Sequence, residues 1–193
     1  MVQSSAYTLE GGGQALVLLH DAAEMPDNLA ALSRALHSGG LTVSVPALEL
    51  GARPWRESIM AARAAFVNLR ERHVCVSVCG LGAGAWAALM LAEEYTPDQL
   101  IIVARESSSL DRYGRREIRR LARRASIDLF ALSTRALVLA ESADRRCMRQ
   151  ARRFTRMMRL PEAEPIAMGE LSGTLCRRMG LCAPSNAPEP SLK

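Results

Sequence analysis

Aromatic residues, lysine and histidine are scarce in this sequence of 193 residues. Phenylalanine, tryptophan and tyrosine make up 4% of the chain, which leaves few flat side chains on which unpaired nucleic-acid bases could stack. The only lysine is Lys193, so arginine carries nearly all of the positive charge. The only histidines are His20, His37 and His73, so any chemistry that needs an imidazole must use one of these three.

Cysteine is present but does not form a metal-binding pattern. The five cysteines, at positions 75, 79, 147, 176 and 182, include no C-x-x-C pair, and no histidine stands at metal-ligand spacing from them. We therefore interpret them as free thiols that pack like small hydrophobic residues. The sequence predicts no metal site and no cofactor.

Long apolar runs are also missing. Apolar runs such as 15–19 and 100–104 are far shorter than the roughly 20 residues that cross a bilayer as a helix. The first residues, MVQSSAYTLEGGG, lack the basic region and long apolar segment of a secretory signal. We expect no membrane helix and a cytoplasmic location.

What is present is enough apolar sequence for one sizeable core, since 49% of the residues are hydrophobic. Short apolar runs typical of buried strands alternate with longer helical patterns near 26–38, 54–72, 83–94, 111–125, 145–158 and 170–179. This alternation predicts a mostly parallel sheet with helices on both faces. We expect a single domain over 1–182 and a flexible tail over 183–193, which is rich in proline and serine.

The positive charge is concentrated in one segment. Sixteen arginines and six acidic residues lie between Arg105 and Arg159, so this segment carries +10 and the rest of the chain −5. The arginines recur at helical spacing in 112–124 and 145–159, and each stripe would suit an anionic partner. Because charged helix faces are usually solvated and aromatic residues are few, nucleic acid is not the partner that the sequence favours.

The stretch CVSVCGLGAGAWAALMLA, residues 75–92, joins an expected strand ending at Cys79 to a helix through a glycine-rich turn. Gly80, Gly82 and Ala85 fit the dinucleotide-binding pattern G-x-G-x-x-[GA], with Glu106 as its ribose ligand. Gly80 and Gly84 also fit the two outer positions of the nucleophile elbow G-x-S-x-G. The turn alone leaves both interpretations open.

Before this turn, the sequence contains His20-Asp21 after a strand, a helix near 26–38, a loop from Pro46 to Gly51, and Trp55 at the start of the next helix. In these features it resembles the carboxylesterase and monoacylglycerol-lipase branch of the α/β-hydrolase superfamily. The resemblance implies a three-layer α/β-hydrolase fold of reduced size without a full lid domain. It also favours the elbow over the dinucleotide pattern. In that pattern the acidic residue normally follows the first glycine after about 20 residues, whereas Glu106 lies 26 residues after Gly80.

Carried over to these positions, the resemblance implies a damaged catalytic triad. Gly82 stands at the position of the nucleophile and Thr174 at that of the histidine base, whereas Asp144 keeps the acid. The resemblance places the two amides of an oxyanion hole at Ala22 and Ala83.

The residues next to this hole differ in their expected roles. His20 has a structural role in the family. Asp21 replaces the family's glycine, and its carboxylate would repel an anion bound in the hole.

The resemblance therefore implies a noncatalytic binding or regulatory protein, whose partner would be a small molecule or a protein, including a second copy of this chain. Two other interpretations stay open. One is a hydrolase that uses unorthodox residues, such as Asp144 with the thiol of Cys79. The other is a dinucleotide-binding protein.

Overall fold

The computed structural model describes residues 6–22, 24–49, 57, 59–105, 135–142, 145–158, 160, 163–166 and 169–180. The strands are β1 (Tyr7–Leu9), β2 (Gln14–Leu19), β3 (Thr42–Val45), β4 (Cys75–Leu81), β5 (Gln99–Ala104), β6 (Arg135–Ala140) and β7 (Glu164–Pro165). A short 3-10 helix, η1 (Pro26–Leu29), precedes the helices α1 (Ala30–Ser38), α3 (Met60–Arg72), α4 (Gly84–Glu94), α6 (Arg145–Met157) and α7 (Leu171–Arg178).

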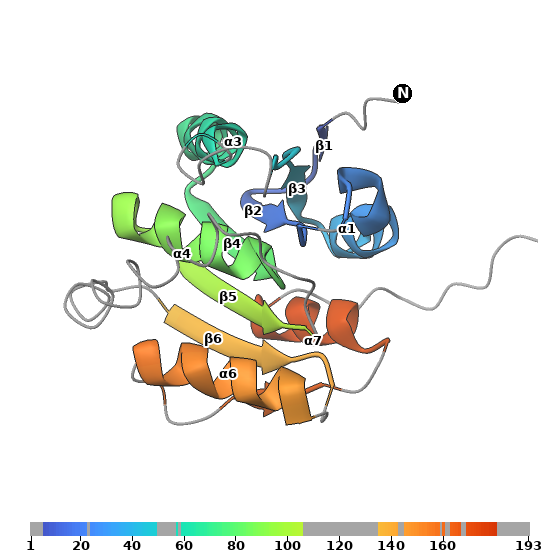
Figure 1. The fold of residues 1–193 in the computed structure, drawn as a ribbon. Coiled ribbons are helices and arrows are strands. Elements are labelled where there is room, and N and C mark those ends of the chain that lie inside the picture. Colours follow the sequence, from blue (N-terminus) through green and yellow to red (C-terminus); the bar gives the residue numbers. More distant parts are fainter. Residues whose placement is uncertain are drawn as a thin grey trace, which may run out of the picture.

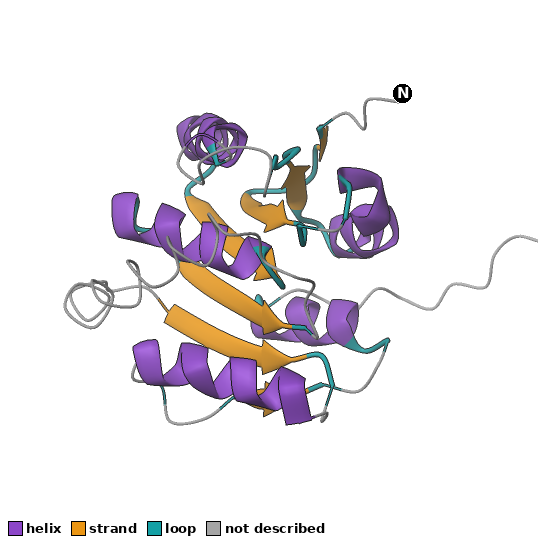
Figure 2. Cartoon of the chain, viewed as in Figure 1, coloured by secondary structure: helices purple, strands orange, loops and turns teal. Residues whose placement is uncertain are grey.

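The seven strands form one sheet in the order β1-β3-β2-β4-β5-β6-β7. Only β1 runs antiparallel to its neighbour, and the other pairs are parallel. Figure 1 shows α3, α4 and α6 on one face of the sheet and α1 and α7 on the other. The helices therefore form the two outer layers and the strands form the middle layer. Figure 2 shows the helices in purple and the strands in orange.

The side chains of the central strands alternate between two hydrophobic cores. In β2, Ala15, Val17 and Leu19 contact the core under α3, α4 and α6. Leu16 and Leu18 contact the core under α1 and α7. Because both faces of the strand are buried, its sequence is continuously apolar rather than alternating.

The structure confirms the predicted three-layer arrangement and moves one boundary of the key strand. The sequence suggested that the strand before the glycine-rich turn ends at Cys79, but β4 continues to Leu81. Gly80 pairs with Leu19 of β2 and with Ile102 of β5, so β4 is still paired with both of its neighbouring strands at this position. The turn therefore begins at Gly82.

Several predicted features lie outside the described residues. These are the arginine-rich helix at 112–124, Trp55, Glu106, Asp144, the domain boundary at 182 and the tail at 183–193. Within the described part of the chain, the structure contains no helix that is long and apolar enough to cross a membrane.

Candidate functional site

The strand order creates a switch point between β2 and β4. After β2 the chain crosses to β3 on one side, and it then returns to β4 on the other side of β2. In open parallel sheets, ligands bind in the crevice that forms at the carboxyl ends of two such strands. Asp21 follows β2, and Gly82 and Ala83 follow β4. The predicted site residues therefore meet at the carboxyl ends of these two strands.

Two glycines allow the turn after β4 to be unusually tight. A Cβ atom on Gly80 would lie 2.3 Å from the carbonyl oxygen of Gly84, and one on Gly84 would lie 2.5 Å from the carbonyl oxygen of His20. The start of α4 thus packs directly on the backbones of β4 and β2, where no larger residue fits. The result is the strand–turn–helix shape that the glycine spacing predicts.

Gly82 lies at the apex of this turn, in the left-handed region with φ +56°. A Cβ atom there would lie 2.1 Å from Oδ2 and 2.4 Å from Cγ of Asp21. The carboxylate of Asp21 therefore occupies the space into which any side chain at position 82 would project. Gly82 suits this turn for two reasons, because it tolerates the backbone conformation and leaves room for a neighbouring side chain.

Asp21 is held in this position by the two amides that the resemblance assigns to the oxyanion hole. The Ala22 N–H donates to Asp21 Oδ1 at 2.6 Å, and the Ala83 N–H donates to the same oxygen at 3.0 Å. Asp21 is only 6% exposed. The site thus presents a pair of convergent N–H donors, and the chain's own carboxylate already accepts from both.

The resemblance suggested that Asp21 would repel a bound anion, but it did not indicate that its carboxylate fills the anion's place. The only signal in the sequence is a pair of substitutions, an acidic residue at 21 and a glycine at 82, that are 61 positions apart. Their relation depends on the pairing of β2 with β4, which brings the ends of the two strands together.

A small ionic network lies beside Asp21. Arg105, which follows β5, places Nη1 2.7 Å from Oε1 of Glu24 and Nε 2.9 Å from Oε2 of Glu141. The second contact has the distance of an ion pair without the alignment of a hydrogen bond. The other oxygen of Glu24 accepts from the Asp21 N–H at 3.3 Å. Side chains from three strand ends therefore brace the loop that carries Asp21.

His20 serves as a backbone connector. Its Nδ1–H donates to the carbonyl oxygen of Asp21 at 2.8 Å, and its Nε2 accepts from the Leu48 N–H at 2.9 Å. Burial lowers the pKa of His20 below the ordinary value of 6.5, although the hydrogen bond to Asp21 and the charges of Glu24 and Asp21 act in the opposite direction. A neutral ring with both nitrogens engaged has no free position with which to take a proton from a substrate.

The other two histidines lie at the opposite ends of the parallel strands from Gly82. His37 is near the end of α1 and contacts the carbonyl oxygen of Leu41, just before β3 begins. His73 follows α3 and precedes the start of β4. Both rings are therefore near the amino ends of parallel strands, whereas Gly82 is at the carboxyl ends.

The two remaining triad positions are not brought together with Gly82 by any described contact. Asp144 lies outside the described residues. Thr174 is inside α7, where its Oγ1 accepts from Arg177 Nη2 at 3.1 Å. It lines a cavity of about 410 Å³ together with other residues of β6, β7 and α7, among them Glu164 of β7, and with Glu170, which directly precedes α7. The assignment of Thr174 to the base position stays a prediction.

The thiol of Cys79 is poorly suited to replace a missing nucleophile. It lies within β4 and is fully buried. Burial raises its pKa to about 12, with a smaller opposing effect from the charge of Arg105. Since the thiolate is the reactive form, this cysteine is protonated at neutral pH. The described residues also contain no group of three or more metal-ligating side chains.

The dinucleotide interpretation does not agree with the position of the turn. In the dinucleotide-binding order, the glycine-rich turn follows the first strand of the unit and leaves the helix N-terminus free for the pyrophosphate. Here the turn follows β4, after β2 and β3 have already formed. The carboxylate of Asp21 also sits on the Ala83 amide at the start of α4, so a phosphate there would meet a negative charge.

Solved structures of α/β hydrolases are similar to this fold over most of the chain. Est1E from Butyrivibrio proteoclasticus has a TM-score of 0.66 at 10% identity, covering 90% of this chain and 92% of that one. MGS-MChE2, an alpha/beta hydrolase enzyme from the metagenome of sediments from the lagoon of Mar Chica, Morocco, has a TM-score of 0.58 at 18% identity, covering 93% and 95%. MenH from S. aureus has a TM-score of 0.58 at 12% identity, covering 86% and 90%.

No family model matches the chain, and no curated protein matches its sequence. The structural likeness nevertheless confirms the fold that the sequence resemblance predicted. The chain has the α/β-hydrolase fold.

Proposed function

We propose that this chain is a noncatalytic binding or regulatory protein built on the α/β-hydrolase fold. The observation that carries this proposal is the place of the Asp21 carboxylate, which accepts from the Ala22 and Ala83 amides directly above the bare backbone of Gly82. Ester hydrolysis through an elbow needs a hydroxyl at this point and an empty pair of donors for the developing oxyanion. In this chain the hydroxyl is absent and the donors are engaged.

The chemistry of the neighbouring groups supports the same proposal. The mechanism also needs a base that an acidic residue orients, and His20 is neutral, buried and bonded at both ring nitrogens. In a serine protease, loss of the nucleophile or the base lowers turnover on the order of 10⁶-fold. A protein that lacks both, and whose anion site is filled, is expected to show no turnover above the uncatalysed rate.

A hydrolase that uses Cys79 has less support. The thiol would have to leave the sheet and lose its proton, yet it is buried within β4 and its pKa is about 12. Asp21 is better placed because it stands at the elbow. Two N–H donors stabilise its charge, however, and such hydrogen bonds reduce the reactivity of a carboxylate toward an acyl group.

The test is hydrolysis of a short-chain aryl ester by the purified chain, together with labelling by a fluorophosphonate probe. We expect no release above the buffer rate and no labelled band. Two matched variants assign any activity that is found, since Asp21→Asn removes the carboxylate charge at nearly constant size and Cys79→Ala removes the thiol. Turnover by the wild-type chain that one of these changes abolishes would contradict the proposal and identify the nucleophile.

A further inference from the structure

The helix α6 carries an unusually dense positive charge. Its sequence, RRCMRQARRFTRM, contains six arginines and no acidic residue, and all six arginines are exposed. The opposite side of the helix is buried through Cys147, Ala151, Phe154 and Thr155. The core thus fixes the helix by one side and leaves the charged side facing outward.

Four of these arginines form a continuous stripe, which we call the arginine face: Arg145, Arg149, Arg152 and Arg156. Their spacing of four, three and four residues places them along one side of an α-helix. Like charges at such spacing repel each other. Among the described residues, no carboxylate forms an ion pair with Arg149, Arg152 or Arg156, so this repulsion is not offset within that part of the chain.

Some other exposed arginines of the described chain have partners, whereas Arg34 and Arg135 form no ion pair within it. Arg70 pairs with Asp98 and Arg72 with Glu10 on α3. On α6 itself, Arg153 lies with its Cζ 5.2 Å from the ring centre of Trp86, a cation–π contact that ties it to the core. The arginine face is therefore distinguished by having three successive arginines without such partners on one side of a helix, and not by arginine content alone.

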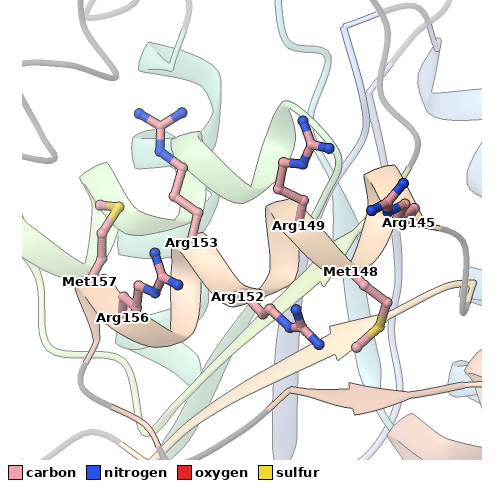
Figure 3. A pocket seen from close by; sticks show the side chains of 7 residues that line it. All are labelled: Arg145, Met148, Arg149, Arg152, Arg153, Arg156 and Met157. Carbon is pink, nitrogen blue, oxygen red and sulfur yellow. The ribbon is translucent and has the colours of Figure 1, made fainter.

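The arginine face borders a hollow that follows the length of the helix. The hollow has a volume of about 780 Å³ and is lined by the arginine face together with Met148, Arg153 and Met157. Figure 3 shows these side chains projecting from successive turns of α6. A thirteen-residue helix is about 20 Å long, so the hollow offers an extended row of guanidinium groups and not a single anion site.

The side chains around the arginine face indicate which kind of partner it suits. Stable protein interfaces have an apolar centre, but the exposed large apolar side chains of the described chain are Met25, Met60, Val67 and Val74, none of them on α6. Insertion into a bilayer would need such side chains as well. Stacking of single-stranded bases would need aromatic residues, and α6 exposes none.

We propose that the arginine face binds the phosphate backbone of a double-stranded nucleic acid. A duplex carries one negative charge per about 1.7 Å of its axis, its bases are already stacked, and its backbone can be recognised by guanidinium groups alone. The scarcity of aromatic residues, which disfavours single strands, does not bear on this mode of binding. The interaction would be independent of base sequence and strongly dependent on salt.

The probe is a fluorescent mixed-sequence DNA duplex of about 20 base pairs, titrated with the full chain at several salt concentrations. Four phosphate contacts predict a log–log slope of the binding constant against salt of about −3.6. The variant Arg149→Gln/Arg152→Gln/Arg156→Gln should lower the affinity at ~50 mM salt by at least about tenfold and flatten the slope by about 3. Glutamine keeps the helix propensity nearly constant.

The matched control removes three positive charges elsewhere. Arg34, Arg70 and Arg72 are exposed on α1 and α3, and their replacement by glutamine changes the net charge by the same amount. This control should retain the wild-type slope. Arg149→Lys/Arg152→Lys/Arg156→Lys should also retain most of the binding, because the charge is kept.

Three results would overturn the proposal: no salt-dependent binding by the wild-type chain, equal losses in the α6 variant and its control, or binding to vesicles that contain an anionic phospholipid without binding to the duplex. A measurement on the wild-type chain makes the test independent of how the variants fold. The Nε–H signals of Arg149, Arg152 and Arg156 should shift in NMR spectra when the duplex is added, whereas those of Arg70 and Arg72 should not.

Discussion

Replacement of Gly82 by alanine should reveal the conflict between a side chain at the elbow and the carboxylate of Asp21. The new Cβ would lie 2.1 Å from Asp21 Oδ2, so the carboxylate must move and release the Ala22 and Ala83 amides. Hydrogen bonds to a charged group contribute about 1.5–3 kcal/mol each, and left-handed backbone costs a residue with a side chain roughly 1–2 kcal/mol. The free energy of unfolding should therefore fall by about 4 kcal/mol or more.

The same replacement should cost much less when Asp21 is absent. In Asp21→Gly, only the backbone term of roughly 1–2 kcal/mol remains, so a double-mutant cycle measured by urea unfolding should give a coupling of at least about 2 kcal/mol. Gly180→Ala is the matched control, because Gly180 has φ +70° and no atom lies within 4 Å of its ideal Cβ. The control should cost the same in both backgrounds, and equal costs for Gly82→Ala in both would refute the steric relation.

Two further predictions concern pH and charge. Burial lowers the pKa of His20 in the folded chain below 6.5. The contribution of His20 to stability should therefore be complete above pH 6.5 and should be lost as the pH falls through the folded-state pKa. The loss should reach up to about 1.4 kcal/mol per pH unit. Urea unfolding of the wild-type chain should show this loss, and His20→Gln should lack it; an unchanged pH profile in the variant would contradict the role of His20. The glutamine variant of Arg149, Arg152 and Arg156 should be more stable than the wild-type chain at low salt by roughly 1–3 kcal/mol, because six like-charge contacts at three- and four-residue spacing disappear. This gain should shrink as salt is added, and a loss of stability at every salt concentration would show that these arginines have structural partners.

The layers and the elbow could be predicted from the sequence because they depend on local patterns. The continuous apolar runs of β2 and β5 indicate strands that are buried on both faces, and Gly80 and Gly84 indicate where a helix packs against backbone. The end of β4 was harder to predict from the sequence. Its last two residues, Gly80 and Leu81, resemble a turn in sequence, and only their pairing with β2 and β5 keeps them in the strand.

The content of the site could be predicted only in part. The absence of a side chain at Gly82 is visible in the sequence, and the convergence of Ala22 and Ala83 follows from the family resemblance. The occupation of their N–H groups by Asp21 depends on a side-chain rotamer at the end of a different strand. Composition could not identify the arginine face either, because arginine dominates the positive charge of the whole chain and only the contacts separate paired from unpaired side chains.

An NMR titration with acetate would test most directly whether the chain fills its own anion site. The amide signals of Ala22 and Ala83 report on the two donors, and acetate has the same charged group as the side chain of Asp21. In the wild-type chain these signals should not shift, because Asp21 Oδ1 already accepts from both amides. In Asp21→Gly both should shift together in a saturable manner. Saturable shifts of both signals in the wild-type chain would contradict the occupied site and, with it, the noncatalytic role derived from it.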